Sequence, residues 1–84
     1  MVNIFLFIEL LRAASGPDTA DHLKTLAMDH CKFASVVVLS DRKIVAQLDC
    51  DTGADGNKVI LEKIASVEGV VQTNIISVVT PVKR

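Results

Sequence analysis

Hydrophobic residues form three long segments along this chain whose pattern is typical of β-strands: residues 2–11, 33–39 and 70–79. The first segment alternates between two rows, and a period of two places such rows on opposite faces of a sheet. Its even row is wholly apolar and consists of Ile4, Leu6, Ile8 and Leu10. Because its odd row also carries Phe5 and Phe7, this strand is expected to be apolar on both faces.

Residues between the first two strands have the spacing of an amphipathic helix. The sequence Ser15-Gly16-Pro17 ends the first strand, and Asp18 or Thr19 is expected to cap the helix at its N-terminus. The apolar positions of this helix are Ala20, Leu23, Leu26 and Ala27. Residues 30–32 are expected to close it.

A second helix is predicted before the last strand. It follows the acidic loop 49–56, and Asp55 or Asn57 is expected to cap it. Its predicted apolar stripe is formed by Ile60, Leu61, Ile64 and Val67. Gly69 then serves as the C-terminal stop, a position at which glycine commonly takes a positive φ.

The middle of the chain predicts a β-hairpin. The β-rich residues 35–39 and 44–48 flank four polar residues, Ser40-Asp41-Arg42-Lys43. The complete order is strand, helix, strand, strand, helix, strand, within a single domain spanning residues 1–84. This order predicts an α+β ferredoxin-like fold, in which two helices lie on one face of a four-stranded antiparallel sheet.

Two helices cover only one face of such a sheet. The even row of the first strand is expected under the helices, which leaves Phe5 and Phe7 on the uncovered face. A chain of 84 residues buries roughly two-thirds or less of its unfolded surface, and association is a common remedy. A homodimer or higher homo-oligomer is therefore expected, with Phe5 and Phe7 in the interface.

Charge and composition argue against several classes of partner. Nine Lys and Arg residues oppose ten Asp and Glu residues, for a net charge of −1, and there is no Trp or Tyr. Direct nucleic-acid binding is not expected, because it needs clustered basic residues or aromatic platforms. Residues 2–11 are too short to span a bilayer and follow no basic n-region, so a cytoplasmic location without membrane association is expected.

No catalytic constellation is evident, and the chain is expected to be neither an enzyme nor dependent on a cofactor. A nucleophile requires a base and an orienting group within reach, and no motif in the sequence positions such a set. Cys31 and Cys50 are widely spaced and form no CxxC pattern. They are predicted to be buried or half-buried free thiols rather than a disulfide.

Two groups of potential metal ligands are also interpreted as structural. They are Asp49, Asp51 and Asp55 in one group, and His22, His30, Cys31 and Cys50 in the other. The acidic loop departs from the EF-hand template at its glycine and glutamate positions. The spacings in the second group exceed those of zinc sites. No metal site is expected.

The closing helix and strand carry a family resemblance. Residues 60–79 end a helix at Gly69-Val70 and continue into a strand with Thr73, before the charged end Pro81-Val82-Lys83-Arg84. This pattern resembles the ligand-binding (RAM) module of Lrp/AsnC-type transcriptional regulators, here without the helix-turn-helix domain. The resemblance implies a role in transcription regulation, a β-sandwich dimer that assembles further, and mixed assembly with a full-length regulator.

In this family small effectors, commonly amino acids, bind between dimers. The ligand-binding residues that the resemblance implies are Ser40, Asp41, Arg42, Lys43 and Thr73. The family often has a Gly-x-x-Asp turn where this chain has residues 40–43, and a Thr-x-Thr strand whose second Thr is here Ile75. Because Arg42 and Lys43 are hydrogen-bond donors that suit a carboxylate, a small carboxylate is favoured over a zwitterionic amino acid.

Two alternatives stay open. The sequence Val67-Glu68-Gly69-Val70 also resembles small NapD-type chaperones, which share the fold and hold a twin-arginine signal peptide. That interpretation requires acids beside an apolar groove, and Glu9 is the acid available within a predicted strand. The other alternative is a purely structural oligomerisation module without a ligand.

Overall fold

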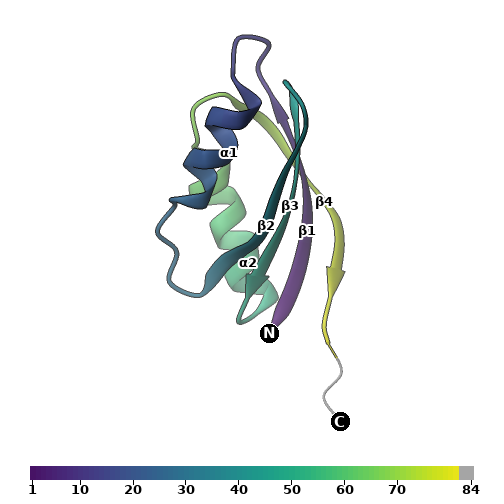
Figure 1. The fold of residues 1–84 in the computed structure, drawn as a ribbon. Helices are drawn as coiled ribbons and strands as arrows, with labels where there is room; N and C mark the ends of the chain where they lie inside the picture. Colours follow the sequence, from purple (N-terminus) through teal and green to yellow (C-terminus); the bar gives the residue numbers. More distant parts are fainter. Residues whose placement is uncertain (82–84) are drawn as a thin grey trace.

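The computed structural model describes residues 1–81, which form four strands and a set of helical segments (Figure 1). The elements follow the chain in the order β1 (Val2–Leu10), α1 (Gly16–Lys24), β2 (Cys31–Ser40), β3 (Lys43–Cys50), α2 (Gly53–Val59), the π-helical segment η1 (Ile60–Ile64) and β4 (Val70–Val79). The strands form one antiparallel sheet in the order β2-β3-β1-β4, with the helices on one face (Figure 1). The predicted ferredoxin-like fold is confirmed. The charged end Lys83-Arg84 lies outside the described residues.

β1 lies between β3 and β4, and its alternation separates the core from the opposite face. Every member of the even row is at most 4 % exposed: Ile4, Leu6, Ile8 and Leu10. This row belongs to a hydrophobic core that also contains Leu23 of α1, Ile44 of β3 and Ile64 of η1. Phe5 and Phe7 are half-buried in the other row. The predicted division of this strand is therefore confirmed.

The N-terminus of α1 lies earlier than its pattern predicts. Ser15 is the N-cap, and its Oγ accepts a hydrogen bond from the Asp18 backbone N–H at 3.4 Å. Pro17 lies in the first turn, where its missing N–H costs no hydrogen bond. The prediction of Asp18 or Thr19 as the cap is therefore wrong by one turn.

The C-terminus of α1 also lies earlier than predicted. The helix ends at Lys24, where the Thr25 hydroxyl donates a hydrogen bond to the His22 carbonyl at 2.7 Å. Residues 25–30 form the connection to β2, which begins at Cys31. Residues 30–32 therefore do not close this helix, contrary to the prediction.

α2 is capped by Thr52 rather than by Asp55 or Asn57. The Thr52 Oγ1 accepts a hydrogen bond from the Asp55 backbone N–H at 3.1 Å. The predicted caps are wrong because a threonine placed before them already satisfies a free N–H group of the first turn.

The apolar stripe of the second helix has three members rather than four. Ile60, Ile64 and Val67 are buried, whereas Leu61 is 73 % exposed. The prediction is wrong at Leu61 because the buried face runs through Val59, Ile60 and Ile64, which leaves Leu61 on the side directed at solvent.

The helical segment ends at Ile64 with Ala65 as its C-cap, so the prediction of Gly69 as its stop is wrong. Gly69 instead takes a φ of 94° in the turn directly before β4. No helical segment within residues 1–81 has the length and apolar character that crossing a bilayer requires.

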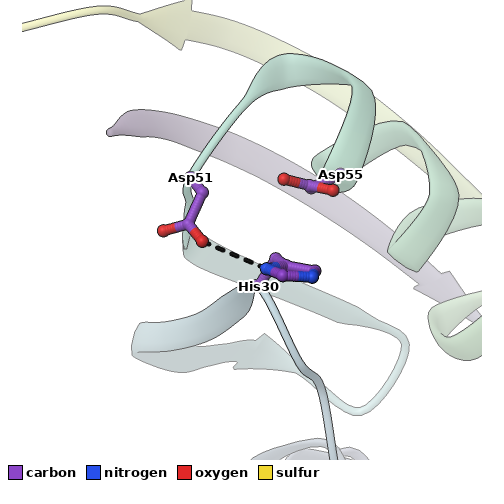
Figure 2. Close-up of side chains that lie close together, drawn as sticks. All are labelled: His30, Asp51 and Asp55. Carbon is purple, nitrogen blue, oxygen red and sulfur yellow. Dashed lines mark hydrogen bonds and ion pairs between the residues drawn. The ribbon is translucent and has the colours of Figure 1, made fainter.

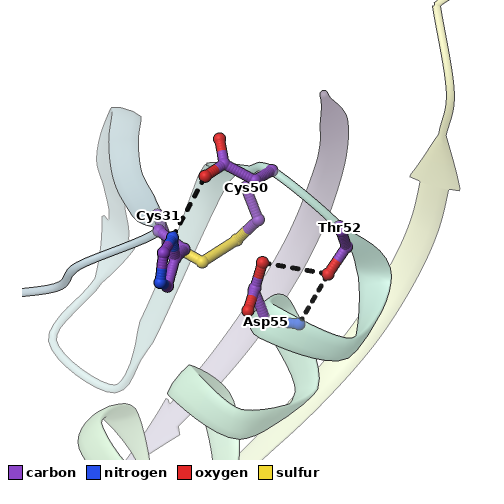
Figure 3. The surroundings of a disulfide bond; sticks show 6 residues. Cys31, Cys50, Thr52 and Asp55 are labelled. Atoms are coloured by element: carbon purple, nitrogen blue, oxygen red, sulfur yellow. Dashed lines mark hydrogen bonds and ion pairs between the residues drawn. A yellow bond between two sulfur atoms is a disulfide. The ribbon is translucent and has the colours of Figure 1, made fainter.

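A disulfide between Cys31 and Cys50 joins β2 to β3 (Figure 3). The two cysteines are register partners, their Cα atoms lie 4.0 Å apart, and both residues are buried. The prediction of free thiols is therefore wrong, because strand pairing brings together residues that are 19 positions apart in the sequence. β3 is also longer than predicted, so that Asp49 belongs to a strand rather than to the acidic loop.

Candidate functional site

The face of the sheet without helices is the first candidate functional surface. Val37, Val45 and Phe7 form a row across three strands in register. Phe5 lies on the same face of β1, opposite Gln47 of β3. Phe5, Phe7 and Val45 are half-buried, and Val37 is 51 % exposed. We refer to Phe5, Phe7, Val37 and Val45 as the outer cluster.

Acidic and basic residues flank the outer cluster at both ends. Glu9 pairs in register with Lys43 at one end, and Asp49 pairs with Lys32 at the other. The Lys43 Nζ lies 6.0 Å from the centre of the Phe7 ring, at the outer limit of a cation–π contact. Each end of the face thus carries one acid and one base, so the charges at each end balance.

β4 leaves a second apolar region uncovered at the edge of the sheet (Figure 1). Five of its large apolar side chains are 43–58 % exposed: Val71, Ile75, Ile76, Val78 and Val79. Register with Leu6 and Ile4 of β1 places Ile75 and Val78 in the helix-facing row. Their exposure shows that the helices do not cover this part of the strand. No charged residue interrupts β4.

The predicted ligand-binding turn is an exposed two-residue connection. Ser40 and Lys43 form the last register pair of β2 and β3, with Asp41 and Arg42 between them. The Arg42 N–H donates to the Ser40 Oγ at 3.4 Å, and its carbonyl accepts from the Leu10 N–H at 2.8 Å. The turn is therefore anchored to the sheet while both of its central residues are exposed to solvent.

Thr73 lies at the same end of the sheet as this turn but on the other face. It is the register partner of Ile8 in the helix-facing row, whereas Lys43 is the partner of Glu9 in the opposite row. The Thr73 Oγ1 is buried without a hydrogen-bond partner among the described residues. None of the five predicted ligand-binding residues lines either of two clefts of about 440 and 360 Å³. One chain alone does not combine Lys43 and Thr73 in a single cleft.

A third feature joins residues that the sequence pattern assigns to separate groups. His30, Asp51 and Asp55 lie together where β2 begins and β3 ends (Figure 2). Neither the acidic loop nor the position of His30 matches a known metal-binding motif. The signal that links them is the cysteine pair, because Cys31 follows His30, Cys50 precedes Asp51, and the hairpin places the two cysteines opposite each other.

Comparison of this chain with protein-family models, with curated proteins and with solved structures found no match. The resemblance of residues 60–79 to Lrp/AsnC-type modules therefore stays a prediction. The outer cluster, the β2–β3 turn and the cluster of His30, Asp51 and Asp55 are the candidate sites that the described residues offer.

Proposed function

We propose that this chain is a self-association module whose helix-free face packs against the same face of a second copy. The supporting observation is the outer cluster, whose four apolar side chains all remain partly in contact with solvent. Complete burial of a large apolar side chain contributes roughly 1.5–3 kcal/mol, and aromatic residues are enriched in interface cores. Packing two sheets face to face removes both outer clusters from water at once.

Charge complementarity favours a second copy over a charged partner. Both ends of the face carry an acid beside a base, Glu9 with Lys43 and Asp49 with Lys32. Either end of a two-fold-related copy presents one acid and one base, so neither end of the interface brings together charges of one sign only. A twin-arginine signal peptide, as in the NapD-type alternative, would meet Lys43 beside Glu9. Nucleic acid would meet both acids.

Sedimentation velocity at micromolar concentration tests this proposal. The wild-type chain is expected to sediment as a dimer or a larger species. Phe7→Lys places a second ammonium group close to Lys43 within the outer cluster, so it is expected to shift the chain to the monomer.

Leu61→Lys is the matched control for this experiment. Leu61 is 73 % exposed on η1, on the helix side of the sheet, and its substitution is expected to leave the sedimentation coefficient unchanged. A monomeric wild type, or a Leu61→Lys variant that dissociates as completely as Phe7→Lys, would rule out the proposed interface.

The exposed turn favours a regulator-type role for the dimer, namely sensing of a small carboxylate and mixed assembly with a full-length Lrp/AsnC-type regulator. Arg42 and Lys43 offer charged donors that suit a carboxylate. Because Lys43 and Thr73 lie on opposite faces of one chain, a site that uses both residues needs a contribution from another subunit. Such a junction site is what the family resemblance implies.

The disulfide bears on the cellular location. Cytosolic thiol systems keep most cysteines reduced, whereas disulfides persist in oxidising compartments. The Cys31–Cys50 bond therefore favours an oxidising compartment over the predicted cytoplasm, where a transcriptional regulator would act. Thiol trapping in intact cells discriminates between these locations: alkylation of both cysteines supports a cytoplasmic regulator, and protection of both supports a module of an oxidising compartment.

A further inference from the structure

Three metal-ligating side chains from three segments converge at one end of the sheet. His30 precedes β2, Asp51 follows β3, and Asp55 lies in the first turn of α2. Their ligand atoms all lie within 4.8 Å of one another, and the His30 Nδ1 is 3.2 Å from the Asp51 Oδ2 (Figure 2). The Thr52 hydroxyl donates to the Asp55 Oδ2 at 2.9 Å and so orients that carboxylate. The side chains of His30 and Asp51 are 62 % and 71 % exposed, so an ion can reach them from solvent.

Buried structure beneath the cluster fixes the backbone of two of these ligands. The disulfide joins Cys31 and Cys50, which immediately adjoin His30 and Asp51 (Figure 3). The Asp51 N–H also donates to the His30 carbonyl at 2.9 Å. The His30 imidazole and the Asp51 carboxylate thus extend from two strand ends that are covalently joined. This crosslink lowers the entropy that the two side chains lose when they bind an ion.

The surrounding charge favours a cation. A cleft of about 360 Å³ opens beside the cluster, and His30 and Asp55 are among its lining residues. Acidic residues of the cleft and cluster outnumber basic ones, with Asp29, Asp51, Asp55 and Glu62 against Lys58 and Lys63. This excess of negative charge attracts a divalent ion. The open cleft leaves room for water to complete its coordination.

We propose that His30, Asp51 and Asp55 form a binding site for a divalent transition-metal ion, with Zn²⁺ as its simplest representative. One imidazole nitrogen and two carboxylate oxygens, with water in the fourth position, form a donor set that suits tetrahedral Zn²⁺. Ca²⁺ instead prefers about six to eight oxygen ligands. His30 coordinates the ion through Nδ1, the nitrogen directed at Asp51, and the ion replaces the hydrogen bond between these two side chains.

Isothermal titration of Zn²⁺ into the tag-free, oxidised chain in a chelator-free buffer tests this site. The wild type is expected to bind one Zn²⁺ per chain, and more tightly than it binds Ca²⁺. His30→Ala removes one ligand and Asp55→Asn replaces a carboxylate by a neutral amide, and each is expected to weaken Zn²⁺ binding at least about tenfold.

His22→Ala is the matched control, because His22 is the other histidine of the chain, is exposed on α1, and lies outside the cluster. The His22→Ala variant is expected to bind Zn²⁺ with the affinity of the wild type. In the same samples, Zn²⁺ is expected to raise the midpoint of thermal unfolding of the wild type and His22→Ala but not of His30→Ala.

Three results would overturn the proposal: no Zn²⁺ uptake by the wild type, equal weakening by His22→Ala and His30→Ala, or unchanged affinity in both ligand variants. Each ligand comes from the same chain, so the titration result does not depend on self-association. If the chain sediments as a monomer but binds Zn²⁺, the metal site is confirmed and the self-association proposal is refuted. If the chain is a dimer that takes up no Zn²⁺, the metal site is refuted and the self-association proposal is unaffected.

Discussion

Cys31 and Cys50 face each other across the β2–β3 ladder with their Cα atoms 4.0 Å apart, and their disulfide closes a loop between residues 19 positions apart. A crosslink over such a loop removes entropy from the unfolded chain and stabilises the fold by about 3 kcal/mol. Reduction is therefore expected to lower the free energy of unfolding by about this amount. Urea unfolding of the wild type with and without a dithiol reductant measures the difference.

The double variant Cys31→Ala/Cys50→Ala is the control for this measurement. It has no disulfide to lose, so the reductant is expected to leave its unfolding curve unchanged. A wild type whose unfolding curve is equally insensitive to the reductant would show that the bond contributes nothing to stability.

α2 packs closely on β1 at Gly56, where an added Cβ would meet the terminal methyl group of Ile4. A Cβ at Gly56 would overlap the Ile4 side chain, which is 1 % exposed. Gly56→Ala is therefore expected to destabilise the fold by about 1–3 kcal/mol through overpacking. Chemical denaturation monitored by circular dichroism gives the change in the free energy of unfolding.

Gly53→Ala is the matched control in the same helix. A Cβ at Gly53 meets no atom within 4 Å, and alanine lowers the entropy of the unfolded chain, so this variant is expected to gain about 0.4–1 kcal/mol. Equal stabilities of the two variants would contradict the close approach of α2 to Ile4.

A thermal-shift screen of amino acids and small carboxylates tests the proposed effector site. A ligand at 100 times its dissociation constant adds about 2.7 kcal/mol of stability, which raises the unfolding midpoint of a domain of this size by roughly 10 °C or more. Lys43→Ala is expected to abolish the shift by removing a donor to the carboxylate. Thr73→Ala is expected to abolish it as well if the site uses both faces through a subunit junction.

The pattern of results separates the alternatives for this site. No shift across the screen favours a purely structural module. A shift that survives both substitutions would show that the effector binds elsewhere, for example in one of the two clefts, because neither Lys43 nor Thr73 lines them.

Local features of the sequence determined the order of the elements and the two faces of β1. The alternation of residues 2–11 depends only on the period of a strand, so Ile4 and Leu6 are buried and Phe5 lies in the opposite row, as expected. The turn at Gly69 also depends on local geometry alone, because a positive φ strongly favours glycine. The helix caps were predicted less well because serine, threonine and aspartate compete for the same N–H groups over a few residues.

The disulfide and the cluster of His30, Asp51 and Asp55 both depend on strand register, which only the tertiary structure determines. A continuous ladder from the pair Ser40 and Lys43 would place Cys31 opposite Thr52. Two register shifts along β2 bring it opposite Cys50 instead, and with it His30 opposite Asp51. Periodicity is a property of each segment alone, whereas bulges and register depend on how segments distant in sequence pack against a shared core, and no local pattern encodes that packing.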